Sequence, residues 1–317
     1  MKVIGVDVGY GHTKVVSAAG QHVFPLLVGK FEERYNTPGL KTALDIVTVL
    51  GEGKYLVGES AGVHAQRFLT SRSIDWIKSA AWKALFHRAL DVAKAKEADD
   101  LMIVTGLPPA YFQMHRVELS AIVKAAAEYH CDRCTVHVLP QPLGSFFSIF
   151  LDASGKLSAK AKDKRVGIVD VGFYTVDFFT IYDLQPVVSE IDSLEGGVSS
   201  ALELLSRDVF SKFTLKMTLA AADKAARAGT VKIAGADKDI GALVTARLDE
   251  LSEQIRARTS DLWGGGQNLD AILVTGGGAA LLKSHLNGSF PKNSVYLSKS
   301  QFANAEGYYK FGLRGHR

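Results

Sequence analysis

The sequence predicts an α/β protein built from two similar domains, each a mixed β-sheet flanked by helices. Short runs of β-branched residues alternate with longer amphipathic stretches, which is typical of α/β layers on mixed sheets. The chain has 317 residues, and single cores tend to split at about 250–300 residues, so two domains of about 150 residues are expected. An internal repeat is the third observation that supports this fold class.

The repeat places one pattern near the start of the chain and again in its middle. KVIGVDVGYGHTKVV at 2–16 and RVGIVDVGFYTVDFF at 165–179 share an apolar strand, Asp-Val-Gly, a short turn and a second apolar strand. The two aspartates, Asp7 and Asp170, are 163 residues apart, about half the chain. Because solenoid repeats have periods of roughly 20–50 residues, this long period indicates two related domains.

The individual elements follow from local patterns. Helices are expected over 74–96, around 117–125, over 198–213 and over 240–255, because apolar residues there recur every three or four positions and share one face. In the second helix, Val117, Ala121, Ile122 and Ala125 are expected to face the core. Runs rich in β-branched residues predict strands at 3–8, 13–18, 21–25, 101–105, 135–139, 166–171, 176–182, 186–191, 271–275 and 294–297.

The segment 152–165 gathers charged and small residues and is expected to be an exposed connection. The expected domains are therefore 1–157 and 158–317.

The composition argues against several classes of protein. The net charge of +4 is too small for this length to indicate nucleic acid or a membrane surface as a main partner. Two cysteines cannot build a disulfide framework, so a reducing, cytoplasmic setting is expected. Asp7 interrupts the apolar N-terminus where a secretory signal would continue, and the longest charge-free apolar segment, 271–282, is too short to cross a bilayer.

Both copies of the repeat are expected to form β-hairpins with phosphate-binding turns. Glycine permits positive φ and lets consecutive backbone N–H groups form an anion-binding concavity. If the hairpins face one another, Asp7 and Asp170 approach the same phosphates, which requires a bridging cation such as Mg²⁺ held through its waters. The first loop comprises Gly9, Tyr10, Gly11, His12 and Thr13, followed by the cation Lys14, and the second comprises Gly172, Phe173, Tyr174 and Thr175.

A third glycine cluster, Gly276, Gly277 and Gly278, follows the strand at 271–275 and opens a helix. A helix N-terminus reached through glycines favours anionic or closely approaching ligands. Many strand-to-helix turns carry glycine for packing alone, so both interpretations stay open. The cluster lacks the Gly-Lys-Ser/Thr ending of a P-loop and the spacing of a dinucleotide fingerprint, which argues against those two folds.

These motifs, with Pro-Gln-Pro at 140–142 and with Thr175 and Asp177 in the second hairpin, occur in the order of the actin/Hsp70/sugar-kinase ATPase superfamily. The chain resembles that superfamily over nearly its whole length. The turn at 193–197 and the closing segment 302–308 look most like the plasmid-segregation (ParM/StbA-type) and archaeal actin-like proteins.

The resemblance implies two actin/RNase H-like domains with a nucleotide cleft between them. It also implies a variable subdomain at about 19–97, a helical subdomain at about 195–268, and a C-terminal helix at about 302–315 that packs back on the first domain.

The same resemblance implies roles for individual residues. The two loops would bind the phosphates of ATP, or of GTP, and Asp7 and Asp170 would hold Mg²⁺ through waters and take part in catalysis. Gln141 would orient the attacking water. Because an amide cannot serve as a strong general base, hydrolysis is expected to be slow. The adenosine would lie against Gly276, Gly277 and Gly278, with Glu195 as a ribose or base contact.

The resulting hypothesis is an actin-like ATPase that polymerises with itself, for plasmid or DNA segregation or for a cytoskeletal role. Lacking a strong basic patch, it would contact neither nucleic acid nor membrane directly and would reach DNA through an adaptor protein. The alternative is a small-molecule kinase of the same superfamily, which needs a carboxylate base at the acceptor hydroxyl. A chaperone-type nucleotide domain would require a peptide-binding domain after it, which is not expected here, whereas a scaffold without hydrolysis stays open.

A last cluster, His130, Cys131, Cys134 and His137, offers four nitrogen or sulfur ligands within eight residues and suggests zinc. No second ligand pair follows along the chain, and alternate residues of a strand point apart. Two structural cysteines at the end of a helix are therefore the preferred interpretation.

Overall fold

The computed structural model describes residues 1–32, 44–69, 71, 73–98, 100–286, 288, 290 and 294–314. The chain divides into two compact units. Unit 1 is Met1–Ser158 with Phe302–Arg317, and unit 2 is Ala159–Gln301.

Unit 1 is built on a five-stranded sheet in the order β3-β2-β1-β7-β8. The first three strands along the chain form an antiparallel meander, and β7 and β8 continue the sheet parallel to β1. The strands are β1 (Lys2–Val8), β2 (His12–Ser17), β3 (Gly20–Pro25), β7 (Asp100–Leu107) and β8 (Arg133–Pro140).

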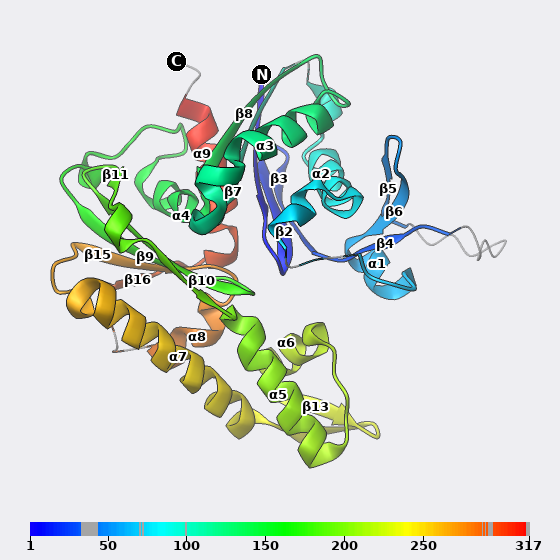
Figure 1. Cartoon of the computed structure of the whole chain (residues 1–317), viewed down its shortest axis with the longest axis vertical. Coiled ribbons are helices and arrows are strands. Elements are labelled where there is room, and N and C mark those ends of the chain that lie inside the picture. Colours follow the sequence, from blue (N-terminus) through cyan, green and yellow to red (C-terminus); the bar gives the residue numbers. More distant parts are fainter. Residues whose placement is uncertain are drawn as a thin grey trace. The chain divides into compact units, whose positions relative to one another are not determined.

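Alternate residues of β1 and β7 face different helices, because the side chains of a strand alternate between its two faces. Ile4 and Ile103 belong to a core shared with α2 and α3, whereas Val3 and Val104 pack against Tyr308 of α9. Figure 1 shows α2 and α9 on opposite sides of this sheet. The helices are α2 (Ala80–Val92), α3 (Pro109–Ala127), α4 (Gln141–Phe150), which packs along α9, and α9 (Ala303–Leu313).

A smaller antiparallel sheet, in the order β4-β6-β5, lies beside α1 and α2. Since β3 belongs to the main sheet, the small sheet begins at Val28 rather than at residue 19, where the variable subdomain was expected to start. Residues 33–43 of that expected subdomain lie outside the described residues. The elements are β4 (Val28–Lys30), β5 (Ile46–Val49), β6 (Gly53–Val57) and α1 (Gly58–His64).

Unit 2 repeats the plan of unit 1. Its sheet has the order β11-β10-β9-β15-β16, with β12 also paired to β10. The hairpin β9–β10 is antiparallel, and β15 and β16 are parallel to β9. The predicted mixed sheets and two related units are thus confirmed. The strands are β9 (Arg165–Val171), β10 (Thr175–Tyr182), β11 (Gln185–Pro186), β12 (Asp192–Glu195), β15 (Ala271–Thr275) and β16 (Ser294–Tyr296).

The helices of unit 2 share one apolar core with its sheet, in which Val169, Phe178 and Val274 are buried. Helices α5 and α7 pack against each other, and α6 packs against α5 (Figure 1). The elements are α5 (Gly197–Phe213), α6 (Leu219–Ala228), α7 (Gly241–Trp263), α8 (Ala279–Leu286) and a hairpin of β13 (Thr230–Ile233) and β14 (Ala236–Asp239).

Three local predictions were wrong. The helix expected over 74–96 is interrupted at Ser79, whose hydroxyl accepts a hydrogen bond of 3.2 Å from Trp82 N and so begins α2 as a new helix. The strand expected at 186–191 is a two-residue strand followed by a 3₁₀ turn. In α3, Val117 is 71% exposed, whereas Leu119 and Val123 are buried. Both faces of α3 carry apolar residues at helical spacing, so periodicity alone could not select the buried one.

Within the ranges that the structure describes, no helix is both long and apolar enough to span a membrane.

Candidate functional site

The turn of the first hairpin is Gly9-Tyr10-Gly11, between β1 and β2. It is closed by the Gly9 N–H, which donates to the His12 carbonyl at 3.2 Å, and Leu26 N donates to the Gly11 carbonyl at 3.0 Å. A Cβ atom on Gly9 would lie 2.9 Å from Lys14 Nζ, so glycine leaves room for the ammonium. Thr13 is fully buried, between β1 and β3.

Three of the predicted site residues meet at the Asp7 carboxylate. Lys14 Nζ donates to Oδ2 at 3.0 Å, and Gln141 Nε2 donates to Oδ1 at 3.1 Å. Asp7 and Lys14 are cross-strand partners, so their side chains leave the sheet on one face. Gln141 is the first residue of α4, and Pro142 suits the first turn because the N–H that it lacks would have no helical partner. The Asp7 and Lys14 side chains are only 5% and 12% exposed.

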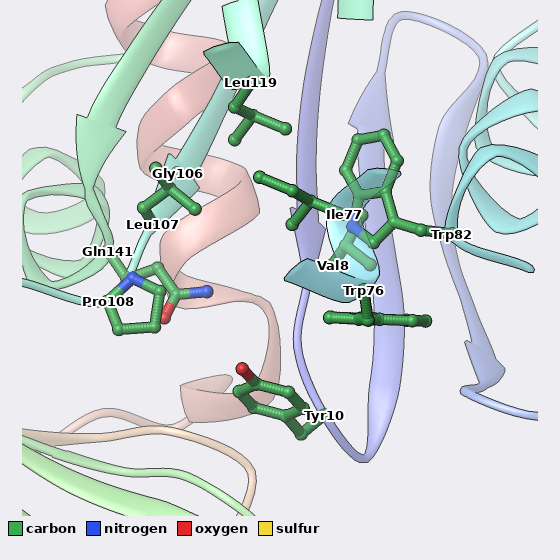
Figure 2. A pocket seen from close by; sticks show the side chains of 10 residues that line it. All are labelled: Val8, Tyr10, Trp76, Ile77, Trp82, Gly106, Leu107, Pro108, Leu119 and Gln141. Carbon is green, nitrogen blue, oxygen red and sulfur yellow. The ribbon is translucent and has the colours of Figure 1, made fainter. Parts of the chain in front are cut away.

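A small pocket lies beside this cluster (Figure 2). Apolar side chains from β1, α2, β7 and α3 line it together with Tyr10, Trp76 and Gln141. The rings of Tyr10 and Trp76 are stacked, with centroids 6.4 Å apart and planes at 28°. The cavity volume of about 20 Å³ is enough for one water molecule, since roughly 10–15 Å³ is needed.

The second hairpin has an equivalent turn, Gly172-Phe173-Tyr174, between β9 and β10. It is closed in the same way, with the Gly172 N–H donating to the Thr175 carbonyl at 2.8 Å. The carbonyl groups of the three turn residues accept hydrogen bonds of 2.7–3.2 Å from backbone N–H groups at the start of α5. Because these peptide bonds are trans, the N–H groups of Phe173, Tyr174 and Thr175 point away from α5. Such a row of N–H groups suits an anion.

Sequence reasoning missed Gly197 as a residue that shapes this turn. Its φ is +44°, and a Cβ atom there would lie 2.8 Å from the carbonyl oxygens of Gly172 and Phe173. The glycine pair after a strand was the available signal. The bulky Phe173 packs against the core of unit 2 and therefore does not cover the turn.

Two carboxylates oppose each other across the second hairpin, Asp170 on β9 and Asp177 on β10. Asp177 accepts hydrogen bonds from the hydroxyls of Ser193 and, at 3.2 Å, of Thr175. Burial, with a smaller contribution from the charge of Asp170, raises the pKa of Asp177 to about 7. The exposed Glu195 stands opposite Thr175 on β12 and so lies beside the turn.

The third glycine cluster connects β15 to α8 and packs on the second hairpin. Gly276 has φ +91°, and a Cβ atom there would overlap the Asp170 carboxylate and the Val171 carbonyl. A Cβ atom on Gly278 would overlap the Val198 side chain, and Gly278 N donates to Val171 O at 2.9 Å. These two glycines are needed for packing, whereas Gly277 has open space around its Cβ position.

The four candidate zinc ligands do not converge. His130 Nε2 lies 3.1 Å from His87 Nδ1 in the core beside α2, whereas the ring of His137 packs on Phe311 of α9, with centroids 5.7 Å apart. Burial raises the pKa of the Cys134 thiol to about 12, which disfavours the thiolate form that binds metal. Among the described residues, no three His, Cys, Asp or Glu side chains are grouped to hold a metal ion.

Comparisons with known proteins cover both units. A family model described as the N-terminal domain of actin-like proteins matches residues 5–144, and a model of archaeal actin homologue MreB-like, C-terminal, matches residues 168–288. An archaeal actin homolog of Thermoplasma volcanium is 26% identical, and one of Thermoplasma acidophilum is 25% identical. Each match covers 97% of this chain and 98% of the relative.

Solved structures show the same fold. A crystal structure of an archaeal actin homolog superposes with a TM-score of 0.80 and 23% identity, covering 99% of this chain and all of the other. A ParM from a 15-stranded Clostridium botulinum filament gives 0.78 and 23%, covering 99% of both chains. An ADP complex of an archaeal actin homolog gives 0.73 and 21%, covering 99% and 100%. The resemblance inferred from the motifs is thus confirmed: the chain is actin-like and is related to the archaeal actin homologues and to ParM.

Proposed function

We propose that this actin-like protein binds Mg-ATP through its two hairpin turns and hydrolyses it slowly. The observation that supports this most strongly is the cluster of Asp7, Lys14 and Gln141, joined by hydrogen bonds of 3.0 and 3.1 Å. The Lys14 ammonium offers a compact positive charge to a polyphosphate. The Gln141 amide can orient a water molecule but cannot accept its proton strongly, so turnover depends on positioning and electrostatics.

The carboxylates suit Mg²⁺, which prefers oxygen ligands and keeps several of its waters. Asp170 would hold the hydrated ion, and the bound ion would favour the charged form of Asp177, the carboxyl group opposite it across the hairpin. Asp7 already accepts hydrogen bonds from Lys14 and Gln141 and would meet the ion only through a water. When bound, the ion would neutralise charge on the β- and γ-phosphates. Gly276, Gly277 and Gly278 would then lie beside the adenosine, with Glu195 at the ribose or base.

The relatives support nucleotide binding and self-assembly. An archaeal actin homolog has been solved in complex with ADP, and a ParM has been solved as a filament. We extend both properties to this chain as part of the proposal, with filaments serving DNA segregation through an adaptor protein or a cytoskeletal role in the cytoplasm. Nucleotide state would act as the switch on subunit contacts.

The pocket beside Gln141 favours an ATPase over a small-molecule kinase. Its volume of about 20 Å³ accommodates one water molecule, so a water fits as the acceptor next to the Gln141 amide.

Sedimentation paired with phosphate release tests the proposal. With Mg-ATP, we expect the protein to pellet and to release phosphate slowly, and we expect neither result when the nucleotide is omitted or EDTA is added. Phosphate transfer that requires a sugar or a small acid would instead establish the kinase, and a protein that binds no nucleotide would overturn the proposal.

A further inference from the structure

We infer that Tyr10 is a second residue that positions the water beside Gln141, with its hydroxyl facing the pocket and its ring held by Trp76. The inference rests on the proposed hydrolysis and adds a side chain to it. In the proposed phosphate-binding turn, only the backbone of Tyr10 takes part.

The volume of the pocket suits a water molecule. A volume of about 20 Å³ exceeds the roughly 10–15 Å³ that one water requires. A water bound there would lie beside Gln141, which donates to the Asp7 carboxylate.

A buried water also needs two to four polar partners, and the walls of this pocket provide few. Val8, Trp82 and Leu107 contribute mostly apolar surface. Besides the indole nitrogens of Trp76 and Trp82, the polar side chains in the lining are those of Gln141 and Tyr10, and Figure 2 shows the Tyr10 hydroxyl pointing toward the side of the pocket where Gln141 lies. A phenol hydroxyl can both donate to and accept from water.

The Gln141 amide can serve only part of the water's needs. Its Nε2 donates to Asp7 at 3.1 Å, which directs one of the two Nε2 protons toward the carboxylate, and Oε1 is the group that can accept from water. A single acceptor fixes the distance of a water but not its orientation. A second contact from Tyr10 would define where the lone pair of the water points, and this determines attack on a phosphorus atom.

Although Tyr10 lies in a turn, its ring is fixed in place by packing. It stacks on Trp76, which is only 5% exposed and belongs to the 3₁₀ turn Ile74–Lys78. That turn is fixed at its C-terminal end because Ser79 donates to the Trp76 carbonyl from both N (2.9 Å) and Oγ (2.6 Å). Locking a functional side chain by a packed neighbour is the usual way to keep it in a productive geometry.

A double-mutant cycle on phosphate release tests the inference, with Tyr10→Phe, Gln141→Ala and the double variant. Tyr10→Phe keeps the ring on Trp76 and removes only the hydroxyl, so kcat should fall about five- to tenfold, the effect of one lost hydrogen bond. The Kd for Mg-ATP and the melting temperature should stay at their wild-type values. In the Gln141→Ala background, Tyr10→Phe should have almost no further effect, because both residues act on one water.

The control variant is Tyr182→Phe, a tyrosine 52% exposed at the end of β10, which should leave kcat unchanged. Trp76→Phe keeps an aromatic partner for Tyr10 and should lower kcat less than Tyr10→Phe does. A wild-type kcat in Tyr10→Phe, or effects that multiply in the double variant, would overturn the inference while the ATPase assignment stands. A wild-type protein that binds Mg-ATP and releases no phosphate would overturn the proposed hydrolysis and this inference together.

Discussion

The two hairpins share a backbone plan and differ in charge. In each, a three-residue turn is closed by the N–H of its first glycine, Gly9 or Gly172. Lys14 stands opposite Asp7 in the first hairpin, whereas a second carboxylate, Asp177, stands opposite Asp170 in the second. The first hairpin therefore contains its own counter-charge, whereas the two carboxylates of the second repel each other, which favours the binding of a proton or a cation.

This difference divides the proposed task between the units. The first hairpin would present the Lys14 ammonium to the phosphates, and its Asp7 would hold the Gln141 amide beside the water. The second hairpin would bind the metal. The carboxyl ends of β7 and β15, the parallel neighbours of β1 and β9, also differ. After β7 the chain lines the water-sized pocket, whereas after β15 a glycine turn packs directly on Asp170.

The largest expected effect comes from removing the Asp170 carboxylate. Asp170→Asn should lower Mg-ATP turnover by about 100-fold or more, because the metal supplies several kcal/mol of charge stabilisation in phosphoryl transfer. Asp7→Asn should cost about tenfold, because Asp7 would meet the metal only through a water, and an amide at position 7 still accepts one hydrogen bond. Phosphate release measured across a Mg²⁺ titration distinguishes the two variants.

Asp170→Asn is expected to raise the Mg²⁺ concentration needed for half-maximal turnover, and Asp7→Asn is expected to change it little. Equal shifts in both variants would show that the charge difference between the hairpins has no consequence for metal binding.

The next effect concerns the pH dependence of stability. The folded-state pKa of Asp177, about 7, lies above the ordinary value of 3.8, so the folded state holds a proton that the unfolded state releases. The stabilising contribution of Asp177 is therefore fully present below about pH 4 and is lost as the pH rises through 7. Asp177→Asn removes this dependence. The free energy of unfolding of the variant minus that of wild type should therefore increase by up to about 4 kcal/mol between pH 4 and pH 8.

Urea unfolding at pH 4, 5, 6.5 and 8, without Mg²⁺ or nucleotide, measures the difference. Asp237→Asn, an exposed aspartate on β14, serves as the matched control and should follow wild type at each pH. Wild-type and Asp177→Asn curves that run parallel would show that Asp177 titrates normally and that the second hairpin holds two charges at neutral pH.

A smaller effect is expected at the glycine turn of unit 2. Gly278→Ala would force a methyl group into Val198 and Val171, and overpacking of this kind costs about 1–3 kcal/mol. Gly277→Ala is the matched control for stability, since nothing lies within 4 Å of its Cβ position. Thermal unfolding should show a lower melting temperature for Gly278→Ala alone. Equal melting temperatures would mean that the turn does not pack closely on β9 and α5.

The repeated hairpins could be predicted from sequence because their signal is local. An apolar strand, Asp-Val-Gly and a second strand fit within fifteen residues of each copy, and the sheets built on them have the same plan. The role of Gln141 came from resemblance alone. Its hydrogen bond to Asp7 joins residues 134 positions apart, and no periodicity or spacing reports such a contact.

Features that depend on distant contacts could not be predicted. Tyr10 and Trp76 are stacked although 66 residues separate them, and the aromatic character of each had no local explanation. Gly197 is constrained by the carbonyls of a turn more than twenty residues earlier. Which face of α3 is buried depends on which face packs on the sheet, and both faces carry apolar residues.

The smallest effect on turnover is expected at Tyr308 of α9, which contacts the backbone of Gln141. The Tyr308 hydroxyl is fully buried and donates to the Gln141 carbonyl at 3.4 Å, in space that Gly106 leaves open. Tyr308→Phe should lower the free energy of unfolding by about 1 kcal/mol and change kcat by less than about threefold, because the Gln141 side chain keeps its bond to Asp7. Urea unfolding and phosphate release test this, with Tyr182→Phe as the exposed control. If Tyr308→Phe lowered kcat as much as Tyr10→Phe, then the backbone anchor from α9, rather than the carboxylate of the first hairpin, would be what holds Gln141 in place.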